Sequence, residues 1–321
     1  MPRRLALNAM ASNSAMIVKY PALDLLPTRR RLTARARWLA TSAPLLLAGC
    51  QSALLDPRGP VGRAERLILV NSLAIMLAIV VPTIVATLAC AWWFRASNKR
   101  ARYLPTWAFS GRIELVVWSI PVMVILLLGG VTWLSSYDLD PAQPLVSDRK
   151  AIDIQIVSLD WKWLFIYPGE RVAVVNELVV PAGVPLHFTL TSASVMNTFF
   201  VPQLGSMIYT MNGMATELHL QADHPGTYYG RSAHFSGDGF SDMEFQVRAV
   251  APGEFDAWVA STRTVSRPLD AASYAALTRQ GLAPRPLLFS AVEPGLFDGI
   301  VMQHIPPGPG PALEGKGARE K

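Results

Sequence analysis

The sequence predicts a membrane-anchored all-β protein, in which a transmembrane hairpin of two helices precedes a Greek-key β-sandwich with C-terminal helical segments. Three observations support this fold class. Two long uncharged apolar runs lie in the first half of the chain, and each is long enough to span a bilayer. Short segments with alternating apolar residues, separated by turn signals, follow from Ala151, as expected for strands. A helical pattern of apolar residues then begins after Pro252.

Residues 1–49 have the features of a secretory signal. Basic residues from Arg29 to Arg37 precede the apolar run Trp38–Leu47, which is too short to cross a membrane. The run ends in the letters L-A-G-C at Cys50, a pattern typical of bacterial lipoproteins, in which the cysteine is lipidated and becomes the mature N-terminus. We therefore predict a lipoprotein signal peptide over 1–49, lipidation at Cys50 and a periplasmic N-terminal segment over 50–66.

The two apolar runs predict a transmembrane hairpin over 67–137, with helices at about 67–94 and 113–136. Leu67–Phe94 contains 28 residues without a charge, and a helix of that length measures roughly 42 Å. The loop 95–112 carries five basic residues and no acidic one. Because positively charged loops stay in the cytoplasm, both ends of the hairpin face the outside, which is also the side that a lipidated Cys50 requires.

The remainder of the chain divides into a linker, a strand-rich domain and a helical end. Ile152, Ile154 and Ile156 alternate with polar residues, and this period-two pattern recurs between Gly- and Pro-containing turns. About eight such strands within roughly 100 residues are typical of a Greek-key sandwich. The predicted bounds are a linker over 138–150, the sandwich over 151–251, a helical segment over 252–304 and a disordered tail over 305–321.

The positive net charge does not lie on the folded body. Residues 1–49 hold eight Lys or Arg and one Asp, a net +7, whereas the whole chain is +6, which leaves −1 for residues 50–321. A nucleic-acid partner is therefore excluded, because such binding needs a basic surface. Cys50 and Cys90 are the two cysteines. Since Cys90 lies in an apolar run, we expect no disulfide between them.

Three motifs together resemble subunit II of the haem–copper respiratory oxidases. The second predicted helix contains Glu114–Pro121, E-L-V-V-W-S-I-P. The predicted sandwich begins with the aromatic segment Asp160–Tyr167, D-W-K-W-L-F-I-Y, and its last part contains the loop Tyr229–Met243. Their particular form is similar to subunit II of bo-type ubiquinol oxidases. The resemblance implies a cupredoxin-like sandwich.

The loop has the frame of a copper site without its ligands. In copper-bearing relatives it carries two cysteines four residues apart, then a histidine and a methionine. Here those positions hold Ser232, Ser236, Phe240 and Met243, and Asn197 stands where the upstream histidine would be. A dinuclear copper centre needs bridging thiolates, because neutral hydroxyls cannot hold and tune copper as soft sulfur does. The resemblance therefore implies that this chain binds no metal or other cofactor.

The resemblance also implies a function and partners. The chain is expected to be the non-redox structural and assembly subunit II of a proton-translocating terminal ubiquinol oxidase, which oxidises ubiquinol and reduces O2 to water. Haems and copper are expected in subunit I, a haem-bearing, many-spanning partner. Small membrane subunits and the lipid bilayer are the other expected partners. The expected location is the bacterial inner membrane, with the sandwich in the periplasm.

Glu114 is the residue of this chain that we expect to act in the complex. A carboxylate at the cytoplasmic end of a transmembrane helix is costly to bury and marks a functional hypothesis. In the resembling family this glutamate marks the entrance of a proton pathway into subunit I. The alternative is an interfacial carboxylate that faces water or pairs with Arg112.

Other residues whose side chains can bind metals or take part in electron transfer are expected to have structural roles. Trp161 and Trp163 lie in the aromatic segment, but no copper centre is expected beneath them, so we predict core packing. His234 lies inside the loop, where relatives provide a backbone carbonyl, and a lone histidine with Met243 makes a poor copper site. Core packing, rather than copper binding by thioethers, is also predicted for three methionines around a turn: Met207, Met211 and Met214.

Two alternatives to the ubiquinol-oxidase hypothesis remain open from the sequence. A copper-containing subunit II of a cytochrome c oxidase would need thiolates at Ser232 and Ser236. A membrane-tethered lipoprotein with a cupredoxin-like sandwich and a separate binding role would not need a carboxylate at Glu114.

Overall fold

The computed structural model describes residues 53–102, 104–308 and 310, which belong to one unit of the chain, Ser52–Lys321. The predicted signal peptide, Cys50 and most of the predicted tail lie outside the described residues. The described chain begins with a short 3-10 helix η1 (Ala53–Leu55) and continues into two long helices, α2 (Pro60–Trp93) and α3 (Gly111–Asp138).

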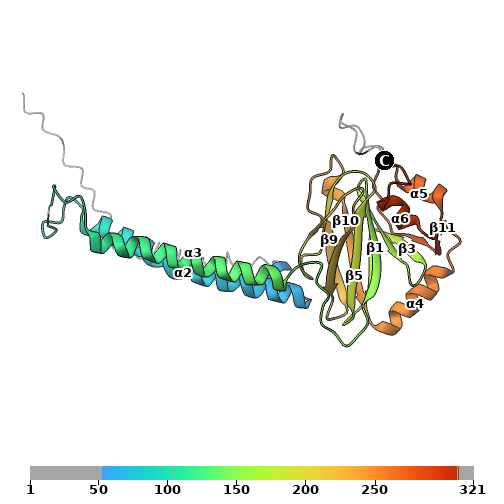
Figure 1. The fold of residues 1–321 in the computed structure, drawn as a ribbon, viewed down its shortest axis with the longest axis horizontal. Helices are drawn as coiled ribbons and strands as arrows, with labels where there is room; N and C mark the ends of the chain where they lie inside the picture. Colours follow the sequence, from blue (N-terminus) through green and yellow to red (C-terminus); the bar gives the residue numbers. More distant parts are fainter. Residues whose placement is uncertain (1–52, 103, 309, 311–321) are drawn as a thin grey trace, which may run out of the picture. The chain divides into compact units, whose positions relative to one another are not determined.

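Helices α2 and α3 form the hairpin that the uncharged runs predict (Figure 1). Their most apolar windows have mean hydropathies of 2.6 and 2.3, and none of the side chains in those windows is buried within the chain. Pro82 and Pro121 lie inside the helices. Two apolar helices of this length meet the requirements for membrane spans, and their exposed apolar surface is available to lipid or to helices of another subunit.

The sandwich consists of two packed sheets (Figure 1). In the first sheet the order is β12-β3-β2-β1-β5-β8, and in the second it is β4-β10-β9-β6-β7. Pairs β1–β5 and β4–β10 are parallel, whereas the other pairs are antiparallel. The strands are β1 (Ile152–Leu159), β2 (Lys162–Tyr167), β3 (Val172–Val175), β4 (Glu177–Pro181), β5 (Pro185–Ser192), β6 (Asn197–Phe200), β7 (Ile208–Thr210), β8 (Thr216–Gln221), β9 (Gly226–Ser232), β10 (Glu244–Val250) and β12 (Leu287–Phe289).

The core between the sheets is built on aromatic rings. Trp163 contacts Phe199 and Phe245 with ring centroids 5.5 and 5.6 Å apart, and those two phenylalanines stack at 5.1 Å. Phe165 adds a tilted contact with Phe245 at 5.2 Å. Such rings contribute to stability through both their buried area and their mutual geometry. Trp163 is fully buried and Trp161 is 2% exposed, which confirms the predicted core packing of both.

The C-terminal region covers the outer face of the first sheet. A second core cluster packs residues such as Leu164 and Ile166 against Tyr274, Phe297 and Ile300. This explains why β2 is buried on both faces. The region is not helical throughout, because β12 extends the first sheet along β3. Its elements are α4 (Pro252–Arg263), β11 (Pro268–Leu269), α5 (Ala271–Leu277), β12, β13 (Ala291–Val292) and α6 (Leu296–Val301).

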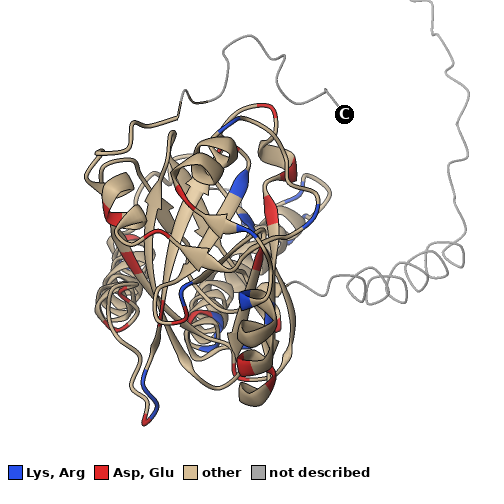
Figure 2. Cartoon of the chain, turned by 90° about the vertical axis from the view of Figure 1, so that its right-hand side faces the viewer, with Lys and Arg blue, Asp and Glu red and all other residues tan. Residues whose placement is uncertain are grey.

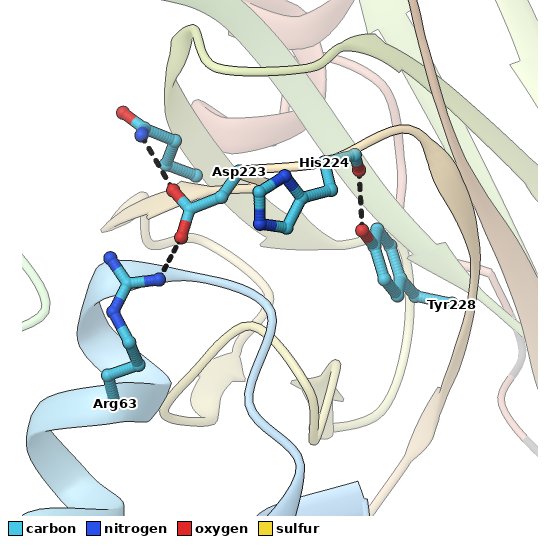
Figure 3. Close-up of polar contacts among 5 residues, drawn as sticks. Arg63, Asp223, His224 and Tyr228 are labelled. Atoms are coloured by element: carbon cyan, nitrogen blue, oxygen red, sulfur yellow. Dashed lines mark hydrogen bonds and ion pairs between the residues drawn. The ribbon is translucent and has the colours of Figure 1, made fainter.

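Helix α2 begins at Pro60 rather than at the expected Leu67. Arg63, in its first turns, forms an ion pair with Asp223, whose other carboxylate oxygen accepts from Gln221 at 2.9 Å (Figure 3). Beside this pair, the Tyr228 hydroxyl donates to the carbonyl of His224 at 2.6 Å. The prediction was wrong because hydropathy detects only the apolar part of a helix, whereas polar residues extend α2 to contacts with the sandwich.

Backbone contacts reinforce this junction. The Gly62 amide donates to the Leu204 carbonyl at 3.0 Å. A Cβ atom at Gly59 would lie 2.2 Å from the carbonyl oxygen of Gln221, so the close approach requires glycine. In the view of Figure 2, basic and acidic residues are interspersed over the described chain, in agreement with the charge argument made from the sequence.

Candidate functional site

The loop 229–243 folds back on the start of β6 and brings four of the positions expected from the copper frame together. Ser232 ends β9 and lies next to Phe199 in the β6–β9 ladder. Asn197, Ser232, Ser236 and Met243 are all buried. They lie close together because β6, β9 and β10 are neighbours in the second sheet.

Neutral hydrogen bonds connect these positions. The Ser232 hydroxyl donates to the side-chain oxygen of Asn197 at 3.1 Å and lies 3.3 Å from the carbonyl oxygen of His234. The Ser236 hydroxyl points to the Met243 sulfur at 4.0 Å. The polar atoms at the centre of the loop therefore bind one another.

The side chains at the other two positions of the copper frame, His234 and Phe240, do not join these hydrogen bonds and pack against aromatic rings instead. His234 offers its backbone carbonyl, whereas its ring packs against Tyr209 at a centroid distance of 5.9 Å. Phe240, at the position of the downstream histidine, packs against Phe235 at 5.6 Å in an edge-to-face arrangement. Both rings make aromatic contacts of ordinary geometry.

Trp161 supports the loop through a hydrogen bond and a ring contact, a role that the sequence did not indicate. Its indole nitrogen donates to the carbonyl of Ser236 at 3.1 Å. Its ring lies so close to Gly239 that a Cβ atom there would be 2.2 Å from the nearest ring carbon. The backbone of Trp161 has a positive φ of 66°, which is uncommon for a bulky residue and indicates a constrained turn. The nearest sequence signal is the second glycine of the G-D-G-F segment, which leaves room for a ring but does not identify which one.

The donor set does not suit a dinuclear copper centre. It consists of two hydroxyls, an amide, a carbonyl and one thioether, none of which can serve as a bridging thiolate. Among the described residues, no group of three or more His, Cys, Asp or Glu side chains is arranged to hold a metal ion. The loop therefore contains no thiolate ligand of the kind that a copper-bearing subunit II needs.

Glu114 lies far along the chain from this loop, in the first turn of α3. Its amide donates to the Ser110 carbonyl at 3.0 Å, and its side chain is exposed. A carboxylate in the first turn interacts favourably with the helix dipole. Among the ion pairs of the described residues, none joins Glu114 to Arg112.

Two methionines do not lie in the core, contrary to the prediction. Met207 is 55% exposed and Met214 is 50% exposed, whereas Met211 is partly buried. They flank β7, which is an edge strand of the second sheet. Side chains on an edge strand and its turns have no neighbouring strand to cover them, and sequence spacing alone does not reveal the edge.

Two family matches cover the sandwich and the C-terminal region. The family described as cytochrome c oxidase subunit II, periplasmic domain, matches residues 125–250, and the COX aromatic rich motif matches residues 263–308. A solved structure, the periplasmic domain of subunit II of cytochrome oxidase from Bradyrhizobium japonicum, is 24% identical with a TM-score of 0.35, and covers 37% of this chain and 96% of that one.

Whole-chain relatives are more similar. Ubiquinol oxidase subunit 2 of Acetobacter aceti is 46% identical over 279 residues, which cover 86% of this chain and 91% of the relative. Cytochrome bo(3) ubiquinol oxidase subunit 2 of Pseudomonas aeruginosa is 46% identical over 277 residues, which cover 86% of this chain and 84% of the relative. These matches define the class as a membrane-anchored subunit II of respiratory oxidases. Within it, the chain belongs to the ubiquinol oxidase subunit 2 family, which confirms the resemblance drawn from the motifs.

Proposed function

We propose that this chain is the non-redox subunit II of a proton-translocating terminal oxidase that takes electrons from ubiquinol and reduces O2 to water. The haem and copper centres lie in subunit I, and small membrane subunits complete the assembly. The observation that carries the proposal is the hydrogen-bonded loop, in which Ser232 and Ser236 stand at the thiolate positions. The names of relatives at 46% identity support it, and family membership favours it over a tethered lipoprotein with a separate role.

The physical basis is the solubility of the electron donor. A water-soluble cytochrome delivers electrons from outside the membrane, so its oxidase needs a redox relay in the extramembrane domain. Ubiquinol is lipophilic and can deliver electrons to a haem within the bilayer. A subunit II without copper then remains a structural part of the complex, and its buried aromatic core does not depend on a metal.

Glu114 contributes the entrance of a proton pathway into subunit I. It lies at the end of α3 that follows the basic loop, so the positive-inside rule puts it on the cytoplasmic side. Its exposed carboxylate is available both to water and to a partner helix. Lipidation at Cys50 tethers the N-terminus on the opposite, periplasmic side of the inner membrane.

The test is the purified complex that contains the full chain. Quinol oxidation is expected at a rate far above that with reduced cytochrome c, with no mixed-valence copper absorption attributable to subunit II. A mixed-valence copper signal that persists after the haem contributions are subtracted would overturn the proposal. So would cytochrome c oxidation that equals quinol oxidation.

The role of Glu114 has a separate test. Glu114→Ala is expected to slow proton uptake and quinol oxidation together, while Glu114→Asp retains part of both. Arg112→Gln, at the same end of α3, is the matched control. Unchanged proton uptake in an assembled Glu114→Ala complex contradicts the role, and the proposed donor would be unaffected by that result.

A further inference from the structure

An apolar niche lies where the hairpin meets the sandwich, between the start of α2 and the linker that follows α3. Its volume is about 280 Å³, so it can hold only part of a larger amphiphile. We call it the outer niche. Its lining residues come from α2, the linker, β8 and one sandwich loop, and most are apolar: Pro60, Val61, Asp138, Leu139, Asp140, Pro141, Gln143, Pro144, Leu145, Val146, Ser206, Leu218 and His219.

The niche is continuous with the membrane-spanning hairpin. Pro60 and Val61 begin α2, and Asp138 ends α3, so the outer ends of both helices form part of its wall. A site at the end of a membrane span lies at the level of the lipid headgroups. Val146 extends fully into solvent from the linker, and an apolar side chain so exposed beside a membrane span suits the boundary between headgroups and acyl chains.

The charged residues of the niche are all acidic. Asp138 is the last residue of α3, where the helix dipole is negative and disfavours a carboxylate. Asp140 accepts a hydrogen bond from the Ala142 amide at 3.0 Å. Neither aspartate has a basic partner among the ion pairs of the described residues, and no Lys or Arg lines the niche. A cation at this position would offset both carboxylates and the end of the dipole.

We propose that the outer niche binds the headgroup of an amine-bearing phospholipid of the outer leaflet, such as phosphatidylethanolamine. The ammonium group lies against Asp138 and Asp140, the Gln143 side-chain amide donates to the phosphate, and the first acyl carbons contact Leu145 and Val146. An anionic phospholipid is disfavoured because its phosphate faces two carboxylates without a compensating cation. The proposal rests on membrane anchoring and does not depend on the identity of the electron donor.

The test uses the assembled complex in nanodiscs that contain a photo-activatable phospholipid with either an ethanolamine or a glycerol headgroup. Wild type is expected to be labelled on residues 138–150, with ethanolamine lipid favoured by about two- to thirtyfold, the range that two exposed ion pairs provide. Asp138→Asn combined with Asp140→Asn is expected to bring the ratio to about one. Val146→Asn, which removes the apolar contact without adding a charge, is expected to reduce labelling by both lipids.

Two control variants leave the niche intact. Asp148→Asn removes an exposed acid of the same linker that does not line the niche, and Met302→Asn changes an exposed apolar residue elsewhere. Both should label as wild type. Equal labelling of wild type by the two lipids, or no label on the linker, overturns the proposal. Loss of subunit I from the Val146→Asn complex, with lipid labelling retained, would also overturn it and would identify a protein as the occupant.

Discussion

Replacing Ser232 by alanine is expected to destabilise the folded chain by about 1–3 kcal/mol. The Ser232 hydroxyl donates to the side-chain oxygen of Asn197 at 3.1 Å, and the two residues are only 3% and 1% exposed. Alanine removes this donor, and a buried acceptor left without a partner costs about 1–3 kcal/mol. In a domain of about 150–250 residues, each kcal/mol lowers Tm by about 2–4 °C, so the loss corresponds to a decrease in Tm of about 2–12 °C.

The assay is thermal unfolding of the full chain in detergent, followed by near-UV circular dichroism of the buried tryptophans. Ser241→Ala is the matched control, because the exposed Ser241 hydroxyl bonds only the neighbouring Asp242 carboxylate, at 3.0 Å. It should change stability by less than about 0.5 kcal/mol. If Ser232→Ala proves as stable as Ser241→Ala, the hydrogen bond to Asn197 does not stabilise the loop.

A double-mutant cycle separates this contact from general effects of truncation. Asn197→Ala and Ser232→Ala should each destabilise, and the double variant should cost less than their sum by at least about 0.5 kcal/mol. A coupling energy of zero would show that the two side chains act independently.

Three further predictions concern the sandwich. Tyr167→Phe removes a buried hydroxyl that donates to the carbonyl of Val179 at 2.8 Å and accepts from its amide at 2.9 Å, so the free energy of unfolding in urea should fall by about 2–4 kcal/mol. Burial and the Glu244 carboxylate raise the pKa of Tyr229 to about 12, and an NMR titration should show Glu244→Gln returning it toward the ordinary value. Because the unfolded pKa is near 10, stability from Tyr229 is present below about pH 10 and lost as pH rises through about 12. Gly239→Ala would place a methyl carbon 2.2 Å from the indole ring under the loop, which should lower stability by about 1–3 kcal/mol and reduce Tm.

Each of these predictions has a control or a contrary outcome. Tyr209 is 50% exposed, so Tyr209→Phe should be nearly neutral, and equal losses from it and Tyr167→Phe would contradict the role of the buried hydroxyl. A wild-type Tyr229 that titrates near its ordinary pKa would contradict the Glu244 interaction. Gly253 has open space where a Cβ would lie. A Gly239→Ala variant no less stable than Gly253→Ala would show that the indole ring of Trp161 moves away from the added methyl group without loss of stability.

The parts of the fold that the sequence predicted are those with a strong one-dimensional signal. An uncharged run identifies a membrane span without knowledge of its neighbours, and alternation identifies a half-buried strand. The start of α2 was missed because Arg63 belongs to the helix through its pair with Asp223, a residue 160 positions away. Similarly, β12 joins the first sheet because Leu287–Phe289 pair with Ala173–Val175, and short strands of this kind have no periodicity to detect.

Some features of the candidate site could likewise be predicted from the sequence, and others could not. The convergence of Asn197 with Ser232 could be anticipated from the spacing of a resembling motif, although the two residues are 35 positions apart. The exposure of Met207 and Met214 could not, because it depends on β7 being a sheet edge. The support that Trp161 gives to Ser236 depends on a positive φ at a turn, and no residue-type preference indicates such a value for tryptophan.

The shape of the loop and its chemistry are therefore separable. A metal centre can hold its loop through ligand bonds, but here the Ser232–Asn197 hydrogen bond, the indole of Trp161 and the packing of Phe240 on Phe235 connect the same segments. Because these contacts use neutral groups and a buried core, the loop conformation does not require copper, and a preserved frame is no sign of a preserved relay. Under the proposed function, the side chains at the two thiolate positions, rather than the fold around them, distinguish a subunit that receives electrons from a water-soluble donor from one that serves a donor dissolved in the membrane.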